Sequence, residues 1–464
     1  MSLDVPNRNW SYPTAIKFGA GRISELADHA KAAGLSRPLL VTDRALASLP
    51  ITARALDVLD RAGLGRAVFS DVDPNPTEAN MQAGIAAFKA GGRDGVICFG
   101  GGSALDLGKM IALMAGQRPG LSVWDLEDVD DWYTRADAGA IAPVVAVPTT
   151  AGTGSEVGRA GVLTNSETHR KKIIFHPRLM PTVTICDPEL TVGMPAFITA
   201  GTGMDALAHC LEAYSSPHYH PMSQGIALEG MRLVFENLPV VYRQPDNLTA
   251  RAHMMSAAMM GAVAFQKGLG AIHSLSHPVG AVYGTHHGTT NAVVMPAVLD
   301  FNRPAIEDRI KAAAAYLGIA GGFDGFRAST LLPEDPVQVK DRSHLRDLLT
   351  QSNSGGIYFT TLQKFGLTQA ERDAGADHPV LSDRRNIIVM ADEAHRSHYD
   401  TLDGYAAHLK NALPNASLIA FTGTPIAEGE RDTRRVFGDD IDVYDLSRAV
   451  DDGATVPVYF EPRL

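Results

Sequence analysis

The sequence predicts an α/β domain with a mostly parallel sheet, then an all-helical domain, then part of a second α/β domain. Over residues 38–150, short apolar runs alternate with helix-like segments, a pattern typical of strand–helix–strand units. From about Pro195 to Tyr316, long amphipathic stretches rich in helix formers dominate. After about Ser329, a polar stretch leads into three strand-like runs. We therefore expect three parts, at residues 1–194, 195–329 and 330–464.

Strands and helices of the first part are predicted from runs bounded by turn residues. The expected strands are residues 38–42, 67–72, 94–100 and 144–148, and the expected helices are residues 51–62 and 78–90. Strands that are apolar on both faces are typical of buried parallel sheets. Such sheets bind ligands at the carboxyl ends of their strands.

The other two parts are predicted on the same grounds. The second part has amphipathic stretches at residues 196–214 and 250–265. In the third part, a polar stretch at 334–354 precedes apolar runs at 356–360, 386–390 and 416–421. We expect the second part to be helical and the third to begin another α/β unit.

Composition narrows the class of protein. The chain has 464 residues, 45% of them hydrophobic, enough for two or three cores. A formal net charge of -11 argues against a protein that coats nucleic acid.

Cys98, Cys186 and Cys210 lie in or beside apolar stretches, and we expect buried, reduced thiols. The sequence shows no signal peptide and no apolar run near the ~20 residues that span a membrane, so we expect a cytoplasmic protein without membrane contact.

Two small-residue loops are candidates for binding phosphate. Gly100, Gly101, Gly102 and Ser103 follow one strand and precede a helical pattern, so backbone N–H groups and a helix N-terminus can face an anion. A second loop of small residues, 148–156, lies at the end of the strand predicted at 144–148. The polar candidates beside the first loop are Asp106 and Lys109, and those in the second loop are Thr149, Thr150, Thr153 and Ser155. Two such loops at strand ends suit the pyrophosphate of a dinucleotide.

Asp43 ends the first strand of this region. A carboxylate there can accept hydrogen bonds from an adenosine ribose and repel a 2′-phosphate. The alternative, favoured by local sequence alone, is an aspartate that caps a helix.

The helical part carries candidate metal ligands. Asp205 and His209 are four residues apart, which places both on one face of a helix. His273 and His277 repeat that spacing, and His287 follows in a His-His-Gly run. One such pair is an ordinary helix contact, but two in one helical domain indicate a mixed oxygen and nitrogen site suited to Fe²⁺ or Zn²⁺.

These motifs together resemble the iron-containing (group III) alcohol dehydrogenases over about residues 16–327. The resembling runs are GGGSALDLGK, PTTAGTGSE, DPELTVGMP, GMDALAHCLEAY and GLGAIHSLSHPVGAVYGTHHG. The resemblance implies an NAD-binding α/β domain followed by an all-helical metal-binding domain of the dehydroquinate-synthase-like architecture. It implies Asp205, His209, His273 and His287 as metal ligands, and it places His277 near the nicotinamide.

The resemblance also implies the chemistry. A divalent ion would stabilise the developing alkoxide of a small alcohol, and hydride would pass to NAD. His277 is the expected proton relay, and Asp43 falls where the family favours NAD over NADP. The resemblance is also compatible with a homodimer.

The third part resembles something else, an internal piece of the motor (R) subunit of type I restriction enzymes. The resembling runs are GGIYFTTLQKF, LSDRRNIIVMADEAHRSHYD, LIAFTGTPI and FGDDIDVYDLSRAVDDGATVPVYF. The resemblance implies a partial RecA-like lobe in which Asp392 and Glu393 are the Walker B acids and residues 422–424 couple hydrolysis to movement. The GxxxxGK[ST] phosphate loop that such motors need does not occur in the sequence.

The sequence thus predicts an NAD-linked dehydrogenase whose helical domain lacks its usual last helices, joined to a motor fragment. The alternatives are a nucleic-acid-translocating ATPase fragment with a remnant dehydrogenase at its front, or a fusion without either activity. Nucleic-acid binding is not expected, because the charge is acidic and the phosphate loop is missing.

Overall fold

The protein divides into two compact units, Met1–Leu331 and Leu332–Leu464, which are described separately. In this computed structural model, the described residues are 8–10, 14–330, 337–351, 358–367, 371, 373, 379–385, 387–391, 405–420, 427–428 and 431–432. None of the described helices combines the length and apolar character that crossing a lipid bilayer requires.

A seven-stranded sheet forms the centre of the α/β part of the first unit, with strand order β1-β2-β9-β6-β5-β3-β4. Apart from β1, which runs antiparallel to β2, the strands pair in parallel. The strands are β1 (Arg8–Trp10), β2 (Ala15–Phe18), β3 (Leu39–Val41), β4 (Val68–Phe69), β5 (Val96–Gly100), β6 (Val144–Pro148) and β9 (Val183–Cys186). The four predicted strands are therefore confirmed, although β4 covers only two residues of the expected 67–72.

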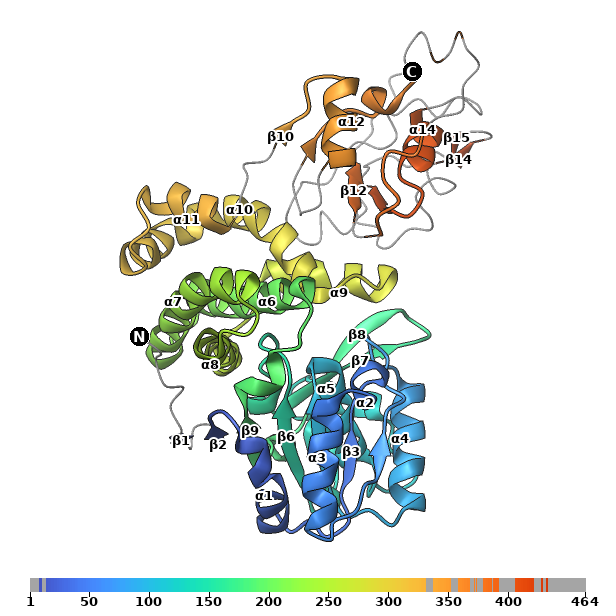
Figure 1. Cartoon of the computed structure of the whole chain (residues 1–464), viewed down its shortest axis with the longest axis vertical. Helices are drawn as coiled ribbons and strands as arrows, with labels where there is room; N and C mark the ends of the chain where they lie inside the picture. Colours follow the sequence, from blue (N-terminus) through green and yellow to red (C-terminus); the bar gives the residue numbers. More distant parts are fainter. Residues whose placement is uncertain are drawn as a thin grey trace, which may run out of the picture. The chain divides into compact units, whose positions relative to one another are not determined.

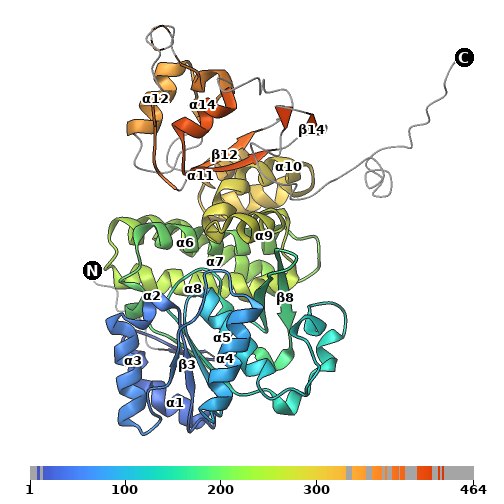
Figure 2. The same cartoon turned by 90° about the vertical axis from the view of Figure 1, so that its right-hand side faces the viewer.

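Helices cover both faces of this sheet. They are α1 (Leu26–Ala32), α2 (Arg44–Ala47), α3 (Pro50–Arg61), α4 (Glu78–Ala90) and α5 (Gly102–Met114). Side chains of β5 alternate between two cores: Val96 and Cys98 pack with α4 and α5, whereas Ile97 and Phe99 pack with α1 and α3. Figure 2 shows α3 and α4 on opposite sides of β3. Both faces are thus buried, as the continuous apolar runs predict.

Short segments complete the α/β part. An antiparallel hairpin pairs β7 (Ala160–Asn165) with β8 (Arg170–Phe175), and β8 packs against the helical part. The 3-10 helices of the unit are Arg22–Glu25, Val123–Leu126, Trp132–Arg135, Ala138–Ala140, Ser155–Val157, Pro177–Leu179, Pro188–Thr191 and Phe265–Lys267. The hairpin was not among the predicted elements.

Six helices form the rest of the first unit and lie over one end of the sheet (Figure 1). They are α6 (Ala196–Ser215), α7 (Pro221–Arg243), α8 (Leu248–Ala264), α9 (Ala271–Tyr283), α10 (His287–Tyr316) and α11 (Gly322–Thr330). The predicted helices at 196–214 and 250–265 are confirmed as α6 and α8. Their core is rich in Met and Ala, so the helices approach closely.

All three cysteines are reduced and buried, as expected. Burial raises the pKa of the Cys98 and Cys210 thiols to about 12, which keeps both protonated and unreactive.

The second unit contains short pieces of α/β structure among its described residues. Its elements are β10 (Val337–Gln338), α12 (Arg342–Gln351), β11 (Tyr358–Phe359), the 3-10 helix Leu362–Phe365, β12 (Ile388–Ala391), α14 (Tyr405–Ala412), β13 (Ser417–Ala420), β14 (Ala427–Glu428) and β15 (Arg431–Asp432). β10 pairs with β11, and β12 with β13, both in parallel. Leu345, Phe365 and Leu409 belong to its small core. Asp392, Glu393 and residues 422–424 lie outside the described residues.

Candidate metal and dinucleotide site

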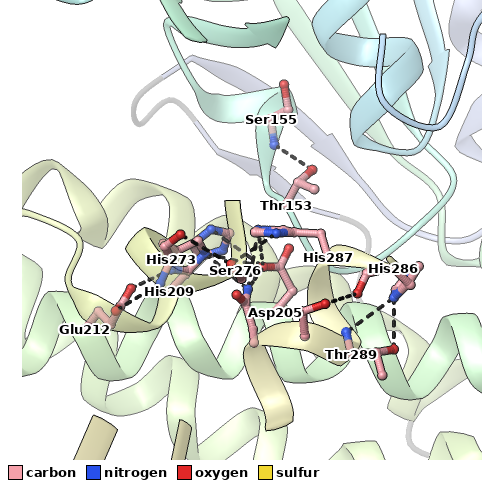
Figure 3. A network of polar contacts seen from close by, with 12 residues as sticks. Thr153, Ser155, Asp205, His209, Glu212, His273, Ser276, His286, His287 and Thr289 are labelled. Carbon is pink, nitrogen blue, oxygen red and sulfur yellow. Dashed lines mark hydrogen bonds and ion pairs between the residues drawn. The ribbon is translucent and has the colours of Figure 1, made fainter. Parts of the chain in front are cut away.

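Four side chains predicted to hold a metal converge between three helices of the first unit. Asp205 and His209 lie on α6, His273 near the start of α9, and His287 at the start of α10. The Oδ1 atom of Asp205 is 3.9 Å from Nε2 of His209 and 3.5 Å from Nε2 of both His273 and His287 (Figure 3). The structure therefore brings Asp205, His273 and His287 into one group, with His209 beside Asp205 but outside that group.

The donor set suits a divalent cation. One potential ligand atom from each of Asp205, His273 and His287 lies within 4.8 Å of the others. Asp205, His209 and His273 are buried, with only 2%, 6% and 3% of their surface exposed. One carboxylate and several imidazoles are typical ligands for Fe²⁺ or Zn²⁺. The residues present thus fit the implied metal.

Charge within the cluster is set by burial and by Asp205. Burial lowers the pKa of His209 to about 4 and that of His287 to about 3, so both imidazoles are neutral near pH 7. Burial also opposes the charge of Asp205, but His209, His287 and His273 outweigh it and lower its pKa. For His273, hydrogen bonds to Asp205 and Glu212 overcome burial and raise the pKa to about 9. To hold a metal through Nε2, His273 would have to lose one of its two imidazole protons.

His277 lies beside the ligands rather than among them. Its ring centroid is 5.9 Å from that of His273, one helical turn away on α9, and 5.1 Å from that of His287. Burial lowers the pKa of His277 to about 4. This neutral imidazole can accept a proton next to the four predicted metal ligands.

Two buried polar residues of the site were missed by the sequence predictions. Oε2 of Glu212 lies 2.5 Å from Nδ1 of His273. Asn291 donates through Nδ2 to Oδ1 of Asp205 at 2.8 Å. A signal for both existed: Glu212 follows Asp205 by seven residues and Asn291 follows His287 by four, spacings that share a helix face.

The two predicted phosphate loops lie against each other at the carboxyl ends of β5 and β6. A Cβ atom on Gly102 would come within 2.6 Å of Thr153, and one on Gly101 within 3.2 Å of Thr150. Gly101 is the N-cap of α5 and has no side chain to cap the helix. Free N–H groups at the start of a 13-residue helix can bind a phosphate. Ser103 lies at the same turn, where its hydroxyl donates to the carbonyl of Pro74 at 2.6 Å.

Asp106 and Lys109 lie behind these loops. Nζ of Lys109 donates to the carbonyl oxygens of Ser155, Gly158 and Ala160 at 2.5, 3.0 and 3.0 Å, and to Oγ of Ser155 at 2.9 Å. Asp106 accepts from Oγ of Ser155 at 2.6 Å and from the Val162 N–H at 3.0 Å. Burial lowers the pKa of Lys109 and raises that of Asp106. Both side chains hold the second loop through contacts within the protein.

Asp43 follows β3, at the same edge of the sheet as both loops. Its Oδ1 accepts a hydrogen bond from the Leu46 N–H at 2.9 Å, so it caps the short helix α2. The capping role that the sequence left open is therefore present. A capping carboxylate at this edge can also face a ribose, because a carboxylate accepts several hydrogen bonds.

The second loop packs directly on helix α8. Gly154 has a φ angle of 62°, and a Cβ atom there would lie 2.3 Å from Cβ of Ala262 and 2.6 Å from the carbonyl oxygen of Ala258. On α8 itself, a Cβ atom on Gly261 would lie 2.9 Å from Cβ of His209. These two glycines thus permit the close approach of the second loop to α8, and of α8 to α6, the helix that carries His209.

Family models match most of the chain. Residues 13–188 match the model of iron-containing alcohol dehydrogenases, and residues 199–334 match the C-terminal model of the Fe-containing alcohol dehydrogenase family. Residues 323–464 match the model of SWI2/SNF2 ATPases.

Individual relatives agree with the two alcohol dehydrogenase matches. A 4-hydroxybutyrate dehydrogenase of Cupriavidus necator is 44% identical over 300 residues, 63% of this chain and 77% of its own length. An NAD-dependent methanol dehydrogenase of Bacillus methanolicus is 37% identical over 369 residues, 74% of this chain and 95% of its own. A solved 1,3-propanediol oxidoreductase superposes with a TM-score of 0.64 at 35% identity, over 68% of this chain and 83% of its own. A sulfoacetaldehyde reductase from Bifidobacterium kashiwanohense, solved with NAD⁺, has a TM-score of 0.63 at 31% identity, over 71% of this chain and 84% of its own.

Proposed function

The chain belongs to the iron-containing alcohol dehydrogenase family, and from this premise we propose that it transfers hydride between a small alcohol, or its aldehyde or ketone, and NAD with the help of a divalent metal. The observation that carries the proposal is the convergence of three imidazoles on Asp205 next to the loops at the ends of β5 and β6. The deciding experiment is NAD reduction by the purified, metal-loaded protein over a panel of short primary alcohols.

In this proposal each group has a distinct task. Asp205, His209, His273 and His287 hold Fe²⁺ or Zn²⁺, which supplies the positive charge that favours ionisation of the alcohol hydroxyl. NAD supplies the hydride acceptor, and the protein orients it. His277, whose imidazole is neutral at pH 7, would relay the hydroxyl proton onward and not retain it, because its lowered pKa makes it a weak base.

Residues other than the four proposed metal ligands would hold NAD. Its pyrophosphate would lie on the backbone of Gly100, Gly101, Gly102 and Ser103 and on the second loop, with Thr149, Thr150, Thr153 and Ser155. Asp106 and Lys109 would support this site indirectly, because their hydrogen bonds to Ser155 hold the second loop in place. The likeness to an NAD-bound sulfoacetaldehyde reductase supports this placement.

The substrate is proposed to be a short primary alcohol. The similar proteins are named for 4-hydroxybutyrate, methanol and 1,3-propanediol. These compounds share a primary hydroxyl on a short chain. We propose that this hydroxyl would bind the metal held by Asp205 and the three histidines.

Asp43 should favour NAD over NADP. In Asp43→Gly, we expect the ratio of kcat/KM for NAD to that for NADP to fall by about 10-fold or more, because the carboxylate repels a 2′-phosphate by roughly 1–4 kcal/mol. Steady-state kinetics with both cofactors measure this ratio. Asp43→Asn, which keeps a capping oxygen but loses the charge, should show most of the effect. Equal use of NAD and NADP by the unmodified protein would contradict this role.

The domain boundaries and the origin of residues 330–464 are also part of this proposal. We propose the α/β domain at residues 1–194, an incomplete helical domain at 195–329 and a motor-lobe fragment at 330–464. The SWI2/SNF2 match supports an origin of the last part in an ATPase. A type I restriction motor subunit is the proposed source.

This last part should not hydrolyse ATP. The sequence has no GxxxxGK[ST] loop: the run from Gly102 has one residue too many before Lys109, and Met110 replaces Ser or Thr. Without that loop, the acids Asp392 and Glu393 have no held triphosphate to act on. We expect no ATP hydrolysis above background, with or without DNA, in a phosphate-release assay. Hydrolysis that disappears in Glu393→Gln would favour the alternative function, a nucleic-acid-translocating ATPase fragment.

A further inference from the structure

A buried glutamate on α6 holds the start of α9. Glu212 is 6% exposed, and its Oε1 accepts from the N–H of Ile272 at 2.6 Å and from that of His273 at 3.4 Å. The N-cap of α9, Gly270, has no side chain that could do this. The first N–H groups of a helix need acceptors, and here a neighbouring helix provides one.

The second oxygen of the same carboxylate holds an imidazole. Oε2 of Glu212 lies 2.5 Å from Nδ1 of His273, and both side chains are at most 5% exposed. A carboxylate accepts only, so Nδ1 carries the proton of this hydrogen bond. Nε2 of His273 then points toward Asp205, 3.5 Å away (Figure 3). One carboxylate therefore sets both the position of the His273 backbone and the orientation of its ring.

The other two imidazoles have no comparable support among the described contacts. Nδ1 of His287 lies 3.4 Å from the hydroxyl of Ser276, a long contact with an uncharged group. His209 has the backbone of Gly152 as a hydrogen-bonding partner, which is also an uncharged group. In the described part of the chain, His273 is thus the one imidazole of the three with a charged acceptor on its far nitrogen.

We propose that Glu212 is a positioning residue that acts through His273, holding this imidazole in the form whose Nε2 lone pair binds the metal. The inference rests on the metal site of the proposed function and adds a residue to it. Carboxylates behind a metal-bound histidine fix its tautomer and ring orientation, and their loss weakens metal binding by about 10–100-fold.

Glu212→Gln tests this role with little change in shape. The amide oxygen can still accept from the Ile272 N–H, so the start of α9 keeps its cap. The amide nitrogen then faces Nδ1 of His273 and donates to it, which moves the imidazole proton to Nε2 and removes the lone pair that the metal needs. We expect Zn²⁺ to bind about 10–100-fold more weakly than to the unmodified protein, in a competition titration against a chromophoric chelator.

Controls separate a positioning role from a merely structural one. Glu229→Gln alters a partly exposed glutamate of α7 that pairs with Arg232, and it should leave Zn²⁺ affinity unchanged. In a His273→Ala background, Glu212→Gln should weaken Zn²⁺ binding no further. The Zn²⁺-loaded, unmodified protein should also show a downfield proton resonance for Nδ1–H of His273 that is lost in His273→Gln, a readout that does not depend on the folding of Glu212→Gln.

The outcomes distinguish the inference from the proposed function. If the unmodified protein does not bind Zn²⁺, the proposed metal site is wrong. If the unmodified protein binds Zn²⁺ and Glu212→Gln binds it equally well, or if the Nδ1–H resonance is absent, the metal site stands and the role of Glu212 is overturned.

Discussion

His273→Ala should yield a folded protein that retains almost no divalent metal and turns over at least about 10³-fold more slowly. A bound metal stabilises the developing alkoxide by several kcal/mol, and each 1.36 kcal/mol changes the rate tenfold. Removal of His273 also leaves Asp205 without one of its three imidazole neighbours, 3.5 Å away. Elemental analysis of the purified variant and NAD reduction with a short alcohol measure both effects.

The same result is expected for His209→Ala, since Nε2 of His209 faces the same oxygen of Asp205 from α6. His218→Ala, which alters an exposed histidine outside the cluster, should retain both metal and turnover. Full activity in protein stripped of metal by a chelator would show that the cluster does not act through a metal.

Lys109→Met should lower the free energy of unfolding of the first unit by about 3–5 kcal/mol. Lys109 is fully buried and donates to three carbonyl oxygens and one hydroxyl. Without it, these acceptors lose a buried donor, which costs about 1–3 kcal/mol for each group left unsatisfied, and the partly buried Asp106 loses a neighbouring positive charge. Urea unfolding followed by circular dichroism measures the change as a lower midpoint.

Lys89→Met is the matched control, because Lys89 lies exposed near the end of α4. It should change the midpoint little. A Lys109→Met protein of unchanged stability that binds NAD much more weakly would instead support the direct contact with phosphate that the sequence suggested.

Much of the first unit could be predicted because its signals are local. The predicted bounds of α4 and β6 coincide with those observed, since apolar periodicity and turn residues define both ends. The hairpin β7–β8 was missed because its turn has no Gly or Pro, and His169 adopts a φ of 50° without a sequence signal. β4 is shorter than expected because it is the last strand of the sheet order, where Val68 is 37% exposed.

Helix α10 shows where local rules fail. It runs for 30 residues and contains Pro296 and Pro304, each of which would normally end or bend a helix. Pro296 is buried in the helical part, so tertiary packing outweighs the local cost. Propensity alone could not predict this outcome.

The sequence predicted that Asp205 and the three histidines lie together, but not the residues that support them. Spacing alone placed Asp205 with His209, and the resemblance selected His287 from the doublet with His286. His286 instead caps α10 through the Thr289 N–H. The structural role of Lys109 could not be inferred from the sequence. The carbonyl oxygens that accept its hydrogen bonds follow it by 46 to 51 residues and come close to it only in the folded protein.

The glycine contacts on α8 couple two parts of the proposed active site, the second loop and His209. Gly154 joins the second loop to α8, and Gly261 joins α8 to His209, in both cases with no space for a methyl group. A shift of α8 would therefore displace the second loop and the helix that carries His209 at the same time. We expect mutations that enlarge either glycine to lower activity toward every substrate alike, because neither position has space for a larger side chain.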